Sequence, residues 1–173
     1  MLFRSDVLWA EQSPAARALA AELDGLEPAS QPSRRLASQI ERLSRLVELG
    51  RYERALPLIK AAVAQGPVAG VDKLLLLEAK CELATAQSDD EFKQAALTAM
   101  RVVIHYDHSQ SLAEALFIAA EAHERLGLVR QAIGLYRDCS NRARAAGELR
   151  MRASDAIDRL SVSTTLHQER ATR

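Results

Sequence analysis

The sequence predicts an all-α protein built as an α-solenoid, a stack of antiparallel helix pairs with a capping helix at its C-terminal end. Apolar residues recur at helical spacing along most of the 173 residues. Two glycine-containing segments, Glu48–Leu56 and Arg125–Ile133, each separate two such patterns and have similar sequences. Ala and Leu are abundant and aromatic residues make up only 4% of the chain, as suits closely packed helices. We expect about three to four repeats.

The composition limits the classes of function. A hydrophobic content of 48% can fill a core, which excludes disorder throughout the chain. Lys+Arg and Asp+Glu number 23 each, so the overall charge gives no reason to expect nucleic acid or an anionic membrane as partner. The longest apolar run, Leu74–Leu77, is far shorter than the roughly 20 residues that span a bilayer. Cys81 and Cys139 lie within apolar helical patterns, which predicts buried thiols rather than a disulfide framework or a reactive thiol.

Residues 1–12 are interpreted as a truncated or artefactual start. The residues after Met1, Leu-Phe-Arg-Ser, are what the sequencing-adapter string CTCTTCCGATCT encodes in one frame. Our hypothesis is that this segment is read-through and that the native start is missing, in which case the lack of a signal peptide carries no meaning. A genomic contig with a ribosome-binding site directly before Met1 would contradict the hypothesis.

The repeat array is expected to cover residues 13–161. Ser13-Pro14 has the residue types of an N-cap and a first helical position, and the helix that follows runs to Leu26. Pro28–Ser33 contains two prolines and is interpreted as a linker.

The first full helix pair flanks Gly50. Apolar spacing predicts a helix over Leu36–Leu49 and a return helix over Tyr52–Gln65, with Pro57 near its start. Gly50 ends the first helix, because the residue just past a helix often adopts a positive φ that glycine tolerates best. Gly66-Pro67 closes the pair.

The second pair begins with the helix that we expect at the centre of the stack. Val71–Ala86 contains four consecutive leucines, which point to all sides of a helix and should therefore be covered on all sides. Ser88 and Glu91 fit a capping box, in which each side chain accepts a hydrogen bond from the other residue's amide. This box would begin the partner helix, Phe92–Ile104.

The third pair has the same plan as the first. Ser111 and Glu114 fit a second capping box, placed before a helix over Leu112–Leu126. Gly127 ends this helix, and Val129–Ala145 is the predicted return helix.

The last predicted helix, Glu148–Leu160, has apolar residues on one stripe and charges elsewhere, as the end of a stack requires. Residues 162–173 are expected to be a frayed polar tail. From Arg137 to Arg173 there are eight arginines and five acids, which are either a solvated face or a docking site for an acidic partner.

Small residues follow both interhelical glycines at the same steps. Ala55 and Ala132 stand five residues after their glycine, and Ala62 and Cys139 stand twelve residues after it. Small side chains at these steps allow two helices to cross closely. This favours a repeat array over a simple bundle of antiparallel helices, which is the alternative fold. The structural repeat positions are Gly50, Ala55, Ala62, Pro67, Ala95, Gly127, Ala132, Tyr136 and Cys139.

This pattern resembles the tetratricopeptide repeat. Leu49–Leu56 together with Pro67 is a close match to the motif of that family, and Glu121–Gly127 with Gln131–Ile133 and Tyr136 is a good one. The pair between them is degenerate. The resemblance implies a right-handed solenoid, in which the first helix of each pair lines a concave surface that holds a peptide or protein.

The likeness covers Leu36–Ala145 and, more faintly, Pro14–Pro28. Within it, Met100–Gly127 is similar to bacterial envelope-associated members of the family, in which a helix ends in an aromatic-Pro-Asp-Ser turn. Here the turn is Tyr106–Ser109 and lacks the proline.

No set of residues points to catalysis. His105 and His108 flank Asp107 in the turn without an evident third ligand, and His123 lies in the middle of a helix. The sequence has no glycine-rich phosphate loop, nucleophile elbow or cysteine pair at metal spacing. We expect no enzyme activity, no cofactor and no metal.

The resemblance also identifies candidates for the partner-binding groove. They are Ile40, Ser44, Val47, Leu76, Lys80, Leu83, Phe117, Glu121 and Glu124. Members of the family that bind the acidic tails of chaperones present Lys and Asn at places occupied here by Ile40 and Ser44, or by Phe117 and Glu121. We therefore expect no micromolar binding of an acidic chaperone-tail peptide.

The expected function is that of a non-catalytic protein–protein interaction scaffold. Its mechanism would be shape, because a preformed groove binds a peptide or protein with little ordering. The alternative is a repeat segment of a larger regulator or enzyme whose catalytic domain lies outside this chain. We expect a soluble protein of the bacterial cytoplasm or periplasm that binds no nucleic acid, and we leave self-association open.

Overall fold

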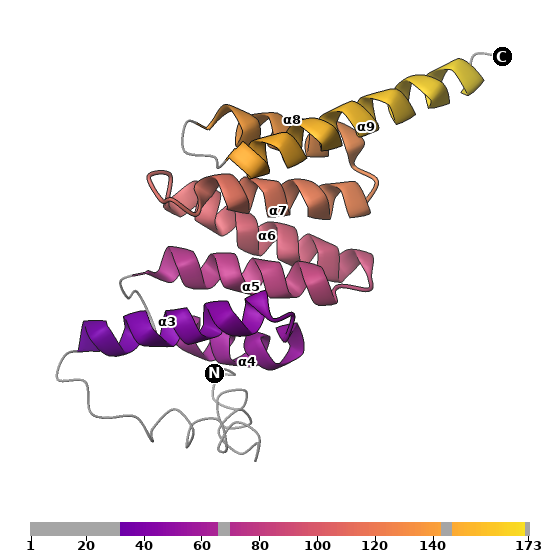
Figure 1. Ribbon diagram of the computed structural model, residues 1–173. Helices are drawn as coiled ribbons and strands as arrows, with labels where there is room; N and C mark the ends of the chain where they lie inside the picture. Colours follow the sequence, from indigo (N-terminus) through magenta and orange to yellow (C-terminus); the bar gives the residue numbers. More distant parts are fainter. Residues whose placement is uncertain (1–31, 66–69, 143–146, 172–173) are drawn as a thin grey trace.

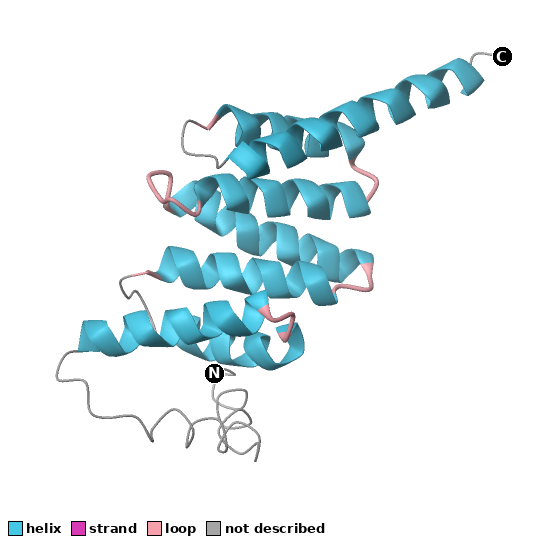
Figure 2. Cartoon of the chain, viewed as in Figure 1, coloured by secondary structure: helices cyan, strands magenta, loops and turns pink. Residues whose placement is uncertain are grey.

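The computed structural model describes residues 32–65, 70–142 and 147–171, and this part of the chain contains helices and turns but no strand (Figure 1, Figure 2). Its helices are α3 (Pro32–Glu48), α4 (Tyr52–Ala64), α5 (Val71–Thr85), α6 (Asp89–His105), α7 (Leu112–Arg125), α8 (Val129–Asn141) and α9 (Gly147–Ala171). The all-α prediction is confirmed. The expectations for residues 1–31 and for Pro67 fall outside the described residues.

The helices pack in the order of the chain, each against the next, from α3–α4 at one end to α8–α9 at the other (Figure 1). In addition, α3 contacts α5, α5 contacts α7, and α7 contacts α9, so the odd-numbered helices form one wall of the stack. Consecutive packing of this kind is what a helical repeat array requires.

Two of the hairpin turns depend on a glycine with positive φ. Gly50 has φ +69° and Gly127 has φ +71°, and nothing lies within 4 Å of the place where either would carry a Cβ. In both turns the residue after the glycine donates a backbone hydrogen bond five residues back, Arg51 to Leu46 and Leu128 to His123, each at 2.9 Å. This is the Schellman ending of a helix. Both glycines were predicted, and their role is conformational rather than a matter of space.

The turn between α5 and α6 has no glycine and uses the predicted capping box instead. The Glu91 amide donates to Ser88 Oγ at 3.4 Å, and the Ser88 amide donates to Glu91 Oε2 at 3.1 Å. The second predicted box, at Ser111 and Glu114, is wrong, because Ser111 makes no side-chain capping bond. Its backbone is already helical (φ −75°, ψ −11°), which turns its hydroxyl away from the first helical amides.

The hydroxyl of Ser111 serves the packing of the loop instead. It lies 3.5 Å from Asp72 Oδ2 at the start of α5, while its amide donates to Ser109 Oγ at 2.9 Å. Ser109 Oγ also donates to Asp72. The loop between α6 and α7 is thus attached to α5.

The residues at the predicted repeat positions on the helices are buried. Ala55, Ala95, Ala132 and Cys139 are fully buried, and Ala62 and Tyr136 are nearly so. In α5, all four leucines of Leu74–Leu77 are buried, and the helix contacts α3, α4, α6 and α7. The prediction that this helix is central is confirmed.

The boundaries of two predicted segments were wrong. α3 begins at Pro32, inside the expected linker, since proline fits the first position of a helix. α9 continues through the expected frayed tail to Ala171, because neither glycine nor proline follows Gly147 to end it. This last part extends away from the stack (Figure 1). None of the described helices is long and apolar enough to cross a membrane.

Candidate functional site

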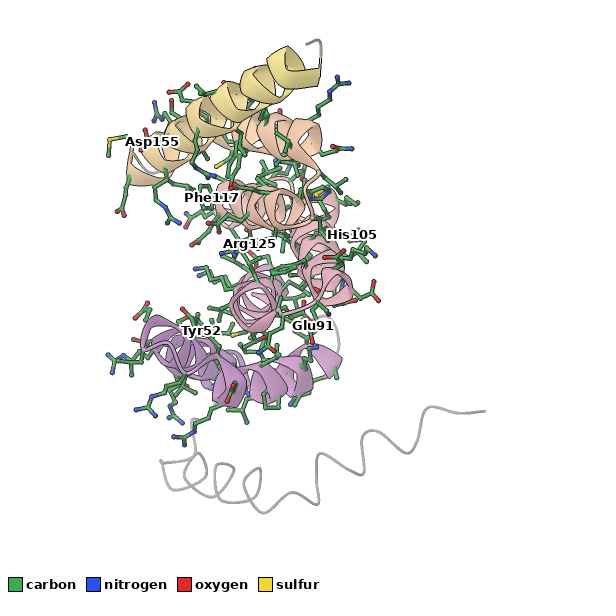
Figure 3. The ribbon with its side chains drawn as sticks, turned by 90° about the vertical axis from the view of Figure 1, so that its right-hand side faces the viewer. Tyr52, Glu91, His105, Phe117, Arg125 and Asp155 are labelled. Carbon is green, nitrogen blue, oxygen red and sulfur yellow. The ribbon has the colours of Figure 1, made fainter. Side chains whose placement is uncertain are left out.

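A cleft of about 960 Å³ lies along the wall of odd-numbered helices. Figure 3 shows the stack as a curved body, with Phe117 on the inner side of the curve and His105 on the opposite side. The lining of the cleft comes from the end of α3, from α5, α7 and α9, and from the starts of α4 and α6. The lining residues are Val47, Tyr52, Lys80, Leu83, Ala84, Ala86, Phe92, Glu114, Phe117, Ile118, Glu121, Glu124, Arg125, Leu149, Arg152 and Arg159.

Six of the nine predicted groove residues line this cleft, namely Val47, Lys80, Leu83, Phe117, Glu121 and Glu124. The other three do not. Ile40 packs into the core between α3, α4 and α5, and a Cβ at Gly70 would stand 2.8 Å from its Cδ1. Leu76 is buried in the cluster formed by α5, α6 and α7. Ser44 is half-buried on α3.

The acids of α7 are matched by cations from the helices on either side. Lys80 Nζ of α5 lies 2.7 Å from Glu114 Oε1. Arg159 of α9 binds Glu124 with both ends of its guanidinium, at 2.5 and 3.1 Å. Two-point pairing of this kind fixes both side chains. These contacts hold α5, α7 and α9 together along the cleft.

Arg152 of α9 is held differently. Its guanidinium stands 4.5 Å above the centre of the Phe117 ring, a cation–π contact. Its nearest carboxylate in the described part of the chain, Glu121 Oε1, is 3.9 Å away, beyond hydrogen-bond distance. The guanidinium is therefore positioned by the ring more than by an acid.

Tyr136 of α8 contacts both Phe117 and Glu124 from the core side of the cleft. The Tyr136 and Phe117 rings pack in a T-shaped arrangement with their centres 5.3 Å apart, and the Tyr136 hydroxyl donates to Glu124 Oε2 at 3.0 Å. Burial, together with the charge of Glu124, raises the pKa of Tyr136, so the phenol stays protonated and remains a donor. Phe117 and Glu124 are thereby fixed from the core side.

The two inner acids have opposite electrostatic surroundings. The hydrogen bonds from Arg159, with a further one from Tyr136, lower the pKa of Glu124. Burial raises the pKa of Glu121, because Arg152 compensates its charge only partly. Glu124 is a stable anion of the wall, whereas Glu121 is a weakly compensated one.

Sequence reasoning missed several residues of the cleft, above all Glu114, Arg152 and Arg159. The sequence shows an excess of arginine near the C-terminal end, but it does not show that Arg152 and Arg159 lie beside α7. A signal did exist. Lys80 and Glu114 are 34 residues apart and Glu124 and Arg159 are 35 apart, which is one repeat length in each case. Opposite charges at the repeat spacing indicate contacts between successive odd-numbered helices.

The other candidates for chemistry lie apart. Among the described residues, no three His, Cys, Asp or Glu side chains gather in a way that could hold a metal ion. His123 Nδ1 contacts the Ala119 carbonyl of its own helix at 2.7 Å. Cys81 and Cys139 are fully buried, as predicted, and burial raises the pKa of each thiol to about 11. Such thiols are protonated and unreactive at neutral pH.

Two further acids are buried in α5, on the sides that face α4 and α6. Glu82 lies 2.9 Å from Lys60 Nζ of α4 and accepts a hydrogen bond from Thr98 Oγ1 of α6 at 2.7 Å. Glu78 is 7% exposed, and its Oε2 has no hydrogen-bond partner among the described residues. Burial and the nearby Glu82 raise the pKa of Glu78, against the effect of Lys60 and Arg101.

Comparison with known proteins found no similar one: no family model, no curated protein and no solved structure matches the chain.

Proposed function

We propose that this protein is a non-catalytic interaction scaffold of the tetratricopeptide-repeat kind, a right-handed solenoid that binds a peptide or protein segment in the cleft along α3, α5, α7 and α9. The observation that carries the proposal is the gathering of aromatic side chains in that cleft. Its geometry and its rigidity support the same function.

Aromatic residues are scarce in the chain and concentrate at the cleft. The described residues include five Phe and Tyr side chains, and three of them, Tyr52, Phe92 and Phe117, line it. A fourth, Tyr136, packs beneath Phe117. Aromatic side chains offer a large contact area with few rotamers, and they are enriched where proteins bind one another.

The cleft is organised before a partner arrives. Ion pairs and the stacking of Arg152 on Phe117 hold the side chains of the cleft in place. The helices that carry these side chains also contribute buried residues to the core. A preformed surface loses less conformational entropy on binding than a mobile one. The lining extends over four odd-numbered helices, which suits an extended segment or a helix better than a small molecule.

The experiment is a selection of binding peptides from a displayed library, followed by a test of where they bind. Ala84 is an exposed alanine of α5 that lines the cleft, and Ala61 is an exposed alanine of α4 that does not. Ala84→Trp should fill part of the cleft and weaken the selected peptides about tenfold or more. Ala61→Trp is the matched control and should leave affinity unchanged.

Circular dichroism checks that both variants keep their helix content. If the selected peptides bind the wild type and the Ala84→Trp variant equally well, or if no peptide is selected, the cleft is not the binding site and the proposal fails.

A further inference from the structure

We propose that the cleft recognises a partner segment that carries one carboxylate beside an apolar residue, with Arg152 of α9 as the group that receives the carboxylate. This inference rests on the proposed function and specifies the chemistry of the partner. Three features of the cleft lead to it: the state of its cations, its balance of charge, and the acids that remain on α7.

The cations of the cleft are not equally available. Lys80 is paired with Glu114 at 2.7 Å, and Arg159 is paired with Glu124 through both of its terminal nitrogens. Among the described residues, Arg152 has no carboxylate within hydrogen-bond distance, and its side chain is 55% exposed. Stacking on the Phe117 ring uses the face of the guanidinium and leaves the donors in its plane free. Arg152 can therefore bind a carboxylate at two points without breaking a hydrogen-bonded pair.

The charge of the cleft is positive once its own pairs are counted. The lining has four cations, Lys80, Arg125, Arg152 and Arg159, against three acids, all of them on α7. An adjoining cavity of about 400 Å³ shares Tyr52, Ala84 and Ala86 with the cleft. Its charged residues are Arg51, Glu53 and Arg54, which again leave one cation in excess. Charge complementarity thus selects an anionic partner over a cationic one.

The number of carboxylates is limited by the glutamates of α7. Glu114, Glu121 and Glu124 lie along the same wall, so a run of acids in the partner would meet three like charges. A single carboxylate at Arg152 would face only the nearest of them, Glu121, whose Oε1 lies 3.9 Å from the guanidinium. Apolar side chains also lie near Arg152, with Phe117 below the guanidinium and Leu149 in the lining of the same cleft. An apolar residue next to the carboxylate would be buried there. This chemistry differs from that of a tail with several acids, which we still expect not to bind.

The experiment uses the full chain and the peptides selected by display. The selected peptides should contain one Asp or Glu next to an apolar residue, and a higher salt concentration should weaken their binding. Replacing that acid by its amide should weaken binding to the wild type about tenfold or more. With the Arg152→Gln variant, the acid and the amide peptide should bind equally. With Lys80→Gln, which removes a cation that already has a partner, the difference between the two peptides should persist.

Two kinds of failure are distinguishable. Peptides that Ala84→Trp displaces but that carry no acid, or whose acid is insensitive to Arg152→Gln, would overturn this inference and leave the proposed function intact. Peptides that Ala84→Trp does not displace would overturn the proposed function, and this inference with it.

Discussion

Glutamates lie on two sides of this stack, and the two sides differ in how well the charge of each carboxylate is compensated. In the cleft, Glu114 and Glu124 of α7 each bind a cation from a neighbouring odd-numbered helix. Toward α4 and α6, Glu82 is paired, but Glu78 beside it is buried with one oxygen that has no partner among the described residues. The comparison teaches that partners and solvent exposure, rather than residue type, decide what a carboxylate does. A paired, half-exposed one shapes a binding surface, and a buried, unpartnered one lowers stability.

The largest effect on stability is expected from removing the Phe117 side chain, which lies beneath the cleft. Phe117 carries the Arg152 guanidinium and packs against Tyr136, and it is 5% exposed. Phe117→Ala should lower the free energy of unfolding by about 3–5 kcal/mol, through lost burial and the cavity left behind. Urea unfolding followed by circular dichroism measures it. Leu97→Ala, at a position of α6 that is 62% exposed, is the control and should change little. A similar small change for Phe117→Ala would show that the ring is not part of the core.

A smaller effect, an increase in stability, is expected from neutralising Glu78 on the side that faces α4 and α6. Glu78→Gln removes a charge that burial disfavours, so it should raise the free energy of unfolding at neutral pH by about 1–3 kcal/mol. The sign depends on pH. Because burial raises the pKa of Glu78 above its ordinary value of 4.5, the folded wild type binds this proton more tightly than the unfolded chain does. Its stability therefore falls as pH rises from that value through the raised pKa.

The difference between Glu78→Gln and wild type should thus be small in acid, grow with pH, and level off above the raised pKa. Urea unfolding at a series of pH values measures it, with Glu53→Gln, an exposed acid of α4, as control. A difference that does not change with pH would mean that Glu78 has a partner for its charge.

The smallest effect is expected from removing one ion pair of the cleft. Arg159 is 60% exposed on its side chain, so Arg159→Gln should lower the free energy of unfolding by only about 0.5–1 kcal/mol. The loss should shrink at high salt, which screens the pair in the wild type. It should also shrink as pH falls through the lowered pKa of Glu124, where the pair loses its negative charge. Thermal unfolding at two salt concentrations tests this, with the exposed Arg137→Gln as control. A loss that salt does not alter would contradict an electrostatic role.

Much of the fold could be predicted because its signals are local. A helix followed by Gly50 or Gly127 needs only the spacing of apolar residues and the preference of glycine for positive φ. The Ser88–Glu91 capping box was correct, whereas the same motif at Ser111 failed. There the partner is Asp72 of a different helix, and a motif of four residues carries no information about a contact so distant in sequence.

The candidate site was predictable only in part, for the same reason. Phe117, Glu121 and Glu124 on α7, with three residues on α5 and α3, are implied by the resemblance to the tetratricopeptide repeat. Arg152 and Arg159 belong to the capping helix, whose arginines the sequence allows to be either a solvated face or a docking site for an acidic partner. Their contacts depend on the register between α7 and α9, which is set by packing across the stack and not by the pattern within either helix.

The length of α9 has a mechanical consequence. Beyond Leu160, which belongs to its core cluster, the helix continues to Ala171, an arm of about 16 Å that extends away from the other described helices (Figure 2). Arg152 and Arg159 lie in the earlier part of the same helix, where they line the cleft. A tilt of α9 at these arginines would therefore displace the distal end of the helix more than the part at the cleft, and a fluorescent label at that end would report the tilt.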